Sequence, residues 1–126
     1  MIILLDLNYT LVRNSEQKAS PFTKQIERET YRIEIIQLVQ EHYVVMITAR
    51  PIVHKTQTLA SIIEKTGWSP QESYFNDTKM YPAHFKRSIV LQKLTHLRRE
   101  VMLAIESNPN TIEMYKKLGI LCLSVR

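Results

Sequence analysis

This sequence of 126 residues is poor in cysteine and lacks a long apolar run. Cys122 is the only cysteine, so no disulfide can form within the chain, and a reducing, cytoplasmic setting is the default expectation. The apolar run at the start covers only residues 1–5, and no basic segment precedes it. Neither a signal peptide nor a membrane span is therefore expected, and we predict no membrane partner.

The chain also lacks an internal repeat, a low-complexity segment and a linker long enough to separate two domains. We therefore expect residues 1–126 to form one domain, close to the most common domain size. Hydrophobic residues make up 44% of the chain and charged residues 23%, which is ordinary for a folded protein and excludes intrinsic disorder.

Charge of one sign is in modest excess. Seventeen lysines and arginines against twelve acidic residues give a net charge of +5. This excess fits an anionic partner such as a nucleotide or a nucleic acid, but it also fits simple solvation of helix faces, because the basic residues are scattered and Arg98 and Arg99 form the densest pair. Charge alone leaves the partner open.

Apolar runs and helical periodicities alternate along the chain. Strands are predicted at residues 1–5, 43–47, 73–75, 101–105 and 120–125, and helices at residues 20–41, 54–66, 82–97 and 112–118. Ser20 and Pro21 are typical of a helix start, and Gly67 and Gly119 of helix ends. Alternating strands and helices with short connections predict an α/β fold with a mainly parallel five-stranded sheet between helix layers.

Polar side chains follow three of these strands. Asp6 follows the first strand, Thr48 the second, and residues 106–108 the fourth, while Lys86 lies in the first turn of the helix after Pro82. The carboxyl ends of parallel strands lie at one edge of a sheet, where ligands of α/β proteins bind. We therefore expect these polar groups to converge there.

This combination of groups suits phosphoryl transfer through a covalent intermediate on Asp6. A carboxylate can attack phosphorus only if the negative charge of the phosphate is neutralised, which a Mg²⁺ ion, Lys86 and the Thr48 hydroxyl would do. Singly, each residue has an ordinary alternative: a turn cap for Asp6, a helix cap for Thr48, a solvated surface charge for Lys86 and a turn acid for Glu106. Their joint occurrence at successive strand ends favours the site.

Nearly the whole chain resembles the haloacid dehalogenase-like (HAD) phosphohydrolases. Residues 6–12, Asp-Leu-Asn-Tyr-Thr-Leu-Val, are similar to the first family motif, Asp-x-Asp-x-Thr followed by a hydrophobic residue. Residues 44–51 resemble the second motif, a hydrophobic strand that ends in Ser or Thr. Phe85-Lys86 at a helix start resembles the third motif, and residues 104–110 with the segment that follows them resemble the acidic fourth motif. Four motifs in this order are specific.

The resemblance implies a three-layer Rossmann-like fold and a set of site residues. Asp6 would be the nucleophile and a magnesium ligand, and the Asn8 backbone carbonyl a second ligand. The implied catalytic residues are Asp6, Asn8, Thr48 and Lys86. The implied phosphate-binding residues are Thr48, Ala49, Arg50 and Lys86. The implied Mg²⁺ ligands are Asp6, Asn8, Glu106 and Ser107.

The small phosphatase domain of polynucleotide kinase-phosphatases is the most similar type within the family. The inserts after the first and second strands are short, so no large cap domain is expected. Family members without caps tend to act on open substrates, and the resemblance therefore implies a phosphorylated substrate such as a nucleotide or a nucleic-acid end. The oligomeric state is not predicted.

Two positions depart from the family pattern. Asn8 stands where the family has its general acid, and an amide cannot transfer a proton at that step. Ser107 replaces the second acid of the fourth motif, which leaves Glu106 as the strong metal ligand there. A working phosphohydrolase is the favoured interpretation. The alternatives are a catalytically silent binding or regulatory protein on the same scaffold, and an asparagine introduced to trap a complex.

Overall fold

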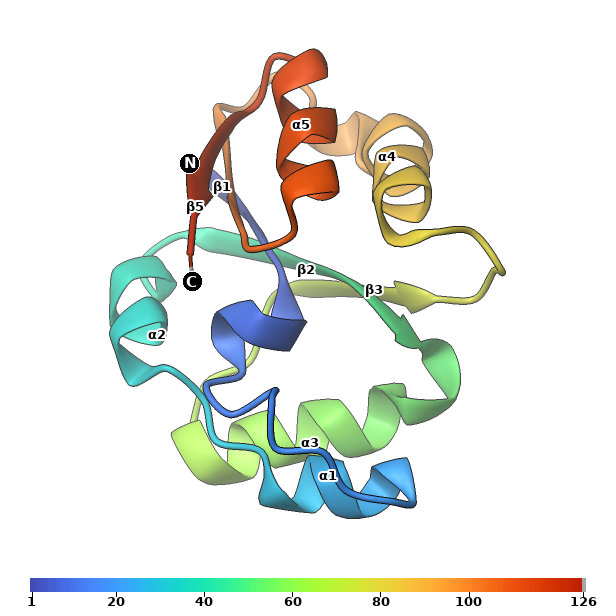
Figure 1. Cartoon of the computed structure of the whole chain (residues 1–126). Coiled ribbons are helices and arrows are strands. Elements are labelled where there is room, and N and C mark those ends of the chain that lie inside the picture. The colour runs from blue at the N-terminus through green and yellow to red at the C-terminus, as the bar shows by residue number, and fades with distance from the viewer. Residues whose placement is uncertain (126) are drawn as a thin grey trace.

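The computed structural model describes residues 1–125, and within them five parallel strands form one sheet in the order β3-β2-β1-β4-β5 (Figure 1). Every neighbouring pair of strands is parallel. The strands are β1 (Ile2–Leu5), β2 (Tyr43–Pro51), β3 (Glu72–Asn76), β4 (Met102–Glu106) and β5 (Leu121–Ser124). The predicted α/β class and the parallel sheet are confirmed.

Helices cover both faces of the sheet. They are α1 (Phe22–Arg28), α2 (Ile33–Val39), α3 (Lys55–Thr66), α4 (Pro82–Lys93) and α5 (Pro109–Lys117). Helices α1, α2 and α3 lie on one side, and α4 and α5 lie on the other (Figure 1). This is the expected three-layer Rossmann-like arrangement. Within residues 1–125, no helix combines the length and the hydropathy needed to cross a bilayer.

Strand β1 occupies the centre of the sheet, and all four of its side chains are buried. Ile3 and Leu5 pack with residues of α2 and α3, whereas Ile2 and Leu4 pack with residues of α4 and α5. A parallel strand that is covered on both faces requires apolar side chains at every position. The uninterrupted run at the start of the sequence therefore reflects this central place.

The prediction of a single helix at residues 20–41 is wrong, because the chain forms two helices there, α1 and α2. Between them Glu29 is extended (φ −62°, ψ 138°), and Tyr31 forms an antiparallel bridge with Val12. Hydrogen bonds from Arg13 N–H to Thr30 O (2.8 Å) and from Arg32 N–H to Leu11 O (2.8 Å) hold this bridge. The apolar spacing continues across the break, so periodicity alone could not reveal a pairing with the distant segment after β1.

Other boundaries differ by a few residues. Strand β2 continues to Pro51 instead of ending at Ile47, and α4 ends at Lys93, so Leu97 lies in a separate short turn, Thr95–Leu97. On α3, Ile62 is fully buried, whereas the neighbouring Ile63 is 53% exposed. Gly67 adopts a left-handed conformation (φ 72°) and ends α3 as predicted, because a residue without Cβ tolerates this backbone shape.

Candidate functional site

The candidate site lies at the centre of the sheet, where the chain changes sides. Strands β1 and β4 are neighbours, but the chain leaves β1 toward α1 and leaves β4 into α5 on the opposite face (Figure 1). Such a switch point opens a crevice at the carboxyl ends of the strands. Asp6 follows β1 and Ser107 follows β4, and Asp6 N–H donates to Ile105 O at 3.0 Å. The fold thus brings two segments about a hundred residues apart to one point.

Asp6, Lys86 and Glu106 form a buried charge cluster. Lys86 Nζ lies 2.7 Å from Asp6 Oδ1 and 2.7 Å from Glu106 Oε2. Asp6 retains 7% exposure, whereas Lys86 and Glu106 are almost fully buried, at 2% and 1%. The first turns of α4 direct the lysine to the strand ends, as its sequence position predicted. The cation therefore links the ends of β1 and β4.

The charges in this cluster do not cancel, since two carboxylates share one ammonium group. Burial alone would lower the pKa of Lys86, but Asp6 and Glu106 outweigh burial and raise it above the ordinary lysine value. Burial raises the pKa of Glu106 to about 7, and Asp6 adds to this effect while Lys86 opposes it. Lys86 thus remains cationic. When Glu106 is ionised, which occurs as the pH rises through about 7, two carboxylates face one ammonium group and a further cation would balance the extra negative charge.

A wide turn, Leu7–Leu11, shapes the chain directly after Asp6. It is closed by a hydrogen bond from Val12 N–H to Leu7 O (2.9 Å), and within it Tyr9 has φ 60°. The turn directs the Thr10 hydroxyl back to Asp6, where Oγ1 donates to Oδ2 at 2.7 Å. Thr10 received no role in the sequence analysis, although its place four residues after Asp6 in the first motif was a usable signal.

Ser107 lies next to Asp6, and Glu106 faces away from it toward Lys86 and the backbone. Ser107 Oγ is 3.4 Å from Asp6 Oδ2 and 3.4 Å from the Asn8 carbonyl oxygen. Glu106 Oε1 accepts hydrogen bonds from Ser107 N–H (3.0 Å) and Asn108 N–H (3.1 Å), and its other oxygen accepts from Lys86. The protein itself therefore occupies both carboxylate oxygens of Glu106.

The oxygens around Ser107 fit a small hard cation. A carboxylate oxygen of Asp6, the Asn8 carbonyl and the Ser107 hydroxyl are the donor types that Mg²⁺ prefers, and the ion retains waters at its other positions. Within residues 1–125, no group of three or more His, Cys, Asp or Glu side chains could hold a metal. A metal held here would therefore have one direct carboxylate ligand and would bind weakly.

The Arg50 guanidinium is bound by three side chains of the protein. Its guanidinium is buried, and it donates from Nη1 to Glu29 Oε1 (3.0 Å) and to Thr58 Oγ1 (3.0 Å), and from Nη2 to Asn8 Oδ1 (2.7 Å). Arg50 N–H also donates to the Thr48 hydroxyl at 3.1 Å. In this arrangement Arg50 contributes to the site by holding Asn8.

Thr48 and Ala49 lie inside β2 and not after it, because the strand extends to Pro51. Thr48 is fully buried, whereas Ala49 is partly exposed. The structure thus groups Asp6, Lys86 and Glu106 most tightly and joins Arg50 to Asn8. Sequence reasoning missed Glu29 and Thr58 because both lie in segments assigned to helices, with no local pattern that indicates a partner on β2.

The Arg50 contact explains why an amide is suited to position 8. Arg50 already balances the buried carboxylate of Glu29, and its second amino group needs only a neutral acceptor. A carboxylate at this position would add a negative charge within two residues of Asp6. The Asn8 amide, with its oxygen bound to Arg50, retains its NH₂ group as a donor.

No protein family and no curated protein matches the sequence. Solved structures share the fold, and two of them are chains of RNA repair complexes. A chain of the Pnkp1/Rnl/Hen1 RNA repair complex superposes with a TM-score of 0.75 at 13% identity over 98% of this chain and 42% of its own length. A chain in another structure of the Pnkp1/Rnl/Hen1 complex superposes with a TM-score of 0.77 at 10% identity. The match covers 98% of this chain and 45% of that chain. This chain thus spans less than half the length of the solved chains that it matches, and the likeness establishes a common fold.

Proposed function

We propose that this chain is a Mg²⁺-dependent phosphomonoester hydrolase that forms an aspartyl-phosphate on Asp6. One observation carries the proposal: a nearly buried carboxylate ends the central strand at the switch point, 2.7 Å from the buried ammonium of Lys86. A carboxylate paired with a fixed cation at that place is suited to attack a phosphate that would otherwise repel it.

The reaction would have two steps. In the first, an oxygen of Asp6 bonds to phosphorus, the bond from phosphorus to the ester oxygen breaks, and the departing oxygen takes a proton from solvent water because Asn8 cannot supply one. In the second, water cleaves the acyl phosphate, which releases phosphate and restores the carboxylate. Lys86 stabilises negative charge throughout, and Thr10 fixes the orientation of the carboxylate. Mg²⁺ held by Asp6, the Asn8 carbonyl and Ser107 would supply further charge neutralisation.

The proposed substrate class is a nucleotide or a nucleic-acid end. The two solved neighbours belong to an RNA repair complex, and the net charge of +5 favours an anionic substrate. Helices lie on the faces of the sheet and leave its carboxyl edge without a covering domain in the described residues 1–125 (Figure 1), which suits a large substrate.

Phosphate release from acetyl phosphate and an aryl phosphate tests the proposed chemistry. Both substrates have good leaving groups, so the missing acid at position 8 matters little. Asp6→Asn should lower Mg²⁺-dependent release to background, and Lys86→Ala should lower it about 10²- to 10³-fold. Lys93→Ala, which removes an exposed lysine from the same helix, is the matched control. Undiminished turnover by Asp6→Asn would refute the covalent mechanism.

A catalytically silent binding protein is the second candidate function, and the contact between Asn8 and Arg50 favours it. The Asn8 amide oxygen accepts a hydrogen bond from Arg50, so this side chain has a structural role in the fold. It has no acidic proton to give to a leaving group. Substitution of Asn8, described in the Discussion, separates this candidate from the hydrolase.

A further inference from the structure

We propose that the cavity beside Asp6 binds the terminal nucleoside and the following phosphodiester of a polynucleotide, an inference that rests on the proposed function. The cavity has a volume of about 450 Å³, and Tyr9, Arg13, Glu16, Arg32 and Ser107 are among its lining residues. This volume is in the range of small-molecule sites. An aromatic ring and two guanidinium groups around one cavity suit a ligand with a flat base and phosphate groups.

The cavity borders the candidate catalytic centre at Ser107. This serine lines the cavity, and its hydroxyl lies 3.4 Å from Asp6 Oδ2. A phosphate held on Asp6 and Lys86 would therefore have its ester group at the mouth of this cavity. For a nucleic-acid end, that group is the sugar of the terminal nucleotide, and the base lies next to it.

Tyr9 is presented to the cavity by an unusual backbone conformation. Its φ of 60° is uncommon for a bulky residue, and its N–H donates to Ser15 Oγ at 2.7 Å. The turn thereby leaves the ring 48% exposed. Lys18 Nζ lies over one face of the ring, 4.9 Å from its centroid, and Lys18 is not among the residues that line the cavity. An open aromatic surface next to a phosphate site is a platform on which a base can stack.

Arg32 is the cavity cation that is available for a second phosphate. Arg13 forms an ion pair with Glu34, at 2.9 and 3.2 Å from its two carboxylate oxygens. Within residues 1–125, the Arg32 guanidinium donates no hydrogen bond, and the hydrogen bonds of this residue are made by its backbone: its N–H donates to Leu11 O, and its carbonyl accepts from the N–H groups of Ile35 and Ile36. Glu16 is the carboxylate in the lining and disfavours a phosphate on its own side. In this subsite the terminal phosphate would lie at Asp6 and the base of the nucleoside on Tyr9. The next phosphodiester would lie at Arg32.

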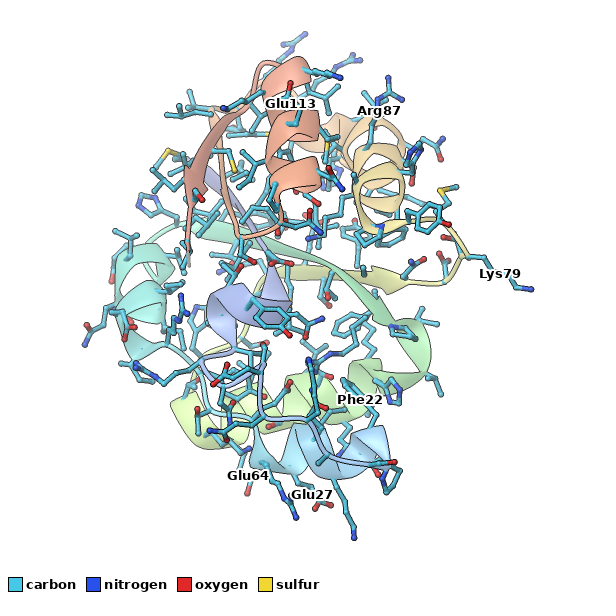
Figure 2. The ribbon with its side chains drawn as sticks, viewed as in Figure 1. Phe22, Glu27, Glu64, Lys79, Arg87 and Glu113 are labelled. Carbon is cyan, nitrogen blue, oxygen red and sulfur yellow. The ribbon has the colours of Figure 1, made fainter. Side chains whose placement is uncertain are left out.

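Three substrates separate the parts of this subsite. Acetyl phosphate has neither a base nor a second phosphate, a nucleoside monophosphate adds the base, and a dinucleotide with a terminal phosphomonoester adds the phosphodiester. Tyr9→Asn removes the ring but tolerates the left-handed backbone, and Arg32→Gln removes the charge. Tyr81→Asn and Arg87→Gln are matched controls, since both side chains are exposed and Arg87 lies on α4, on the opposite face of the sheet (Figure 2).

Each variant has a distinct expected result. Tyr9→Asn should lower kcat/KM about 5- to 150-fold for the nucleotide and the dinucleotide, the range of one stacked base, and should lower it much less for acetyl phosphate, which has no base to stack. Arg32→Gln should lower kcat/KM for the dinucleotide alone, because only this substrate has a phosphodiester. Tyr9→Phe should act like the parent chain. Equal losses on all three substrates, or no loss on the dinucleotide, would overturn the subsite.

A binding measurement makes this test independent of catalysis. A fluorescent oligonucleotide with a terminal hydroxyl, the product of the reaction, is titrated without Mg²⁺ at several salt concentrations. Arg32→Gln should reduce the slope of log K against log salt by about 0.7, the value for one phosphate contact on a single strand. Weaker binding by both variants without any turnover by the parent would support the subsite and refute the hydrolase. If both variants bind the oligonucleotide as well as the parent does and the parent hydrolyses acetyl phosphate, the subsite is refuted and the hydrolase is supported.

Discussion

The side chain of Asn8 connects the catalytic turn to β2. Its Oδ1 accepts a hydrogen bond from Arg50 at 2.7 Å, and its backbone carbonyl lies 3.4 Å from Ser107 Oγ. The residue thus has a structural partner on one side and a candidate metal ligand on the other. The amide has no acidic proton to give to the leaving group. The identity of this one residue therefore separates the hydrolase from the silent scaffold.

Asn8→Asp should restore proton transfer if the rest of the site is competent. A carboxyl of the same shape retains the Arg50 contact, and general acid catalysis contributes about 10²- to 10⁴-fold in rate. The gain should be large for an oligonucleotide with a terminal phosphate and small for an aryl phosphate, whose leaving group needs little protonation. Mg²⁺-dependent phosphate release by parent and variant measures it. If neither substrate gains while the variant stays folded, the silent scaffold is the better interpretation.

Ser107 offers a separate test of the metal site. Ser107→Asp adds a carboxylate next to Asp6 Oδ2 and the Asn8 carbonyl, so it should tighten Mg²⁺ binding measured by calorimetry. Asp6→Ala should abolish the binding. Glu106→Gln should weaken it less than Asp6→Ala does, because Asp6 Oδ2 lies beside Ser107 Oγ and the Asn8 carbonyl, whereas the Glu106 carboxylate is directed toward Lys86 and the backbone N–H of Ser107. A loss from Glu106→Gln as large as that from Asp6→Ala would support the sequence prediction that Glu106 is itself a Mg²⁺ ligand.

Among the elements, the end of α1 and the end of β2 are tied by a buried ion pair. Glu29 and Arg50 are each only 2% exposed. The guanidinium carbon of Arg50 lies 4.9 Å from the centroid of the Phe22 ring. Glu29 sits where the chain leaves α1 for the short bridge at Tyr31. The ion pair therefore fixes the position of α1 against the sheet and, through Arg50, the position of Asn8.

Glu29→Ala should destabilise the fold strongly, because it leaves the Arg50 guanidinium buried without its counterion. Loss of one partner of a buried pair costs about 3–5 kcal/mol in the free energy of unfolding. Glu27→Ala is the control, since Glu27 lies two residues earlier, near the end of α1, with an exposed side chain (Figure 2). Denaturant unfolding measures both. The double variant Glu29→Met/Arg50→Met should recover much of the loss, whereas equal effects of Glu29→Ala and Glu27→Ala would contradict the assignment.

For the whole molecule, burial of β1 on both faces determines stability. Leu4 and Leu5 point to opposite helix layers, and both are at most 1% exposed. Leu4→Ala and Leu5→Ala should each cost about 2–5 kcal/mol, because each leaves a cavity in a separate core. Leu123→Ala on the edge strand β5, where the side chain is 44% exposed, should cost much less. Thermal unfolding checks this, and a small effect at either core position would mean that one layer is loosely packed.

The sequence by itself determined the order and type of most elements and the residues at the strand ends. Asp6 and Lys86 were predictable because an apolar run that stops at a carboxylate and a helix start after Pro82 are local signals, and parallel topology brings their ends together. The same reasoning extended one helix over residues 20–41, since apolar spacing is unchanged across the break at Glu29.

Only the tertiary structure decided which polar groups meet. The pairing of Arg50 with Glu29 and Asn8 joins residues 21 and 42 positions apart, and the contact of Ser107 with Asp6 joins residues 101 positions apart. Such contacts depend on the order of the strands and on the direction of each side chain, which no local spacing encodes. The sequence could therefore name the residues at the carboxyl edge, but burial and packing determined that Arg50 holds Asn8 and that Glu106 holds Lys86.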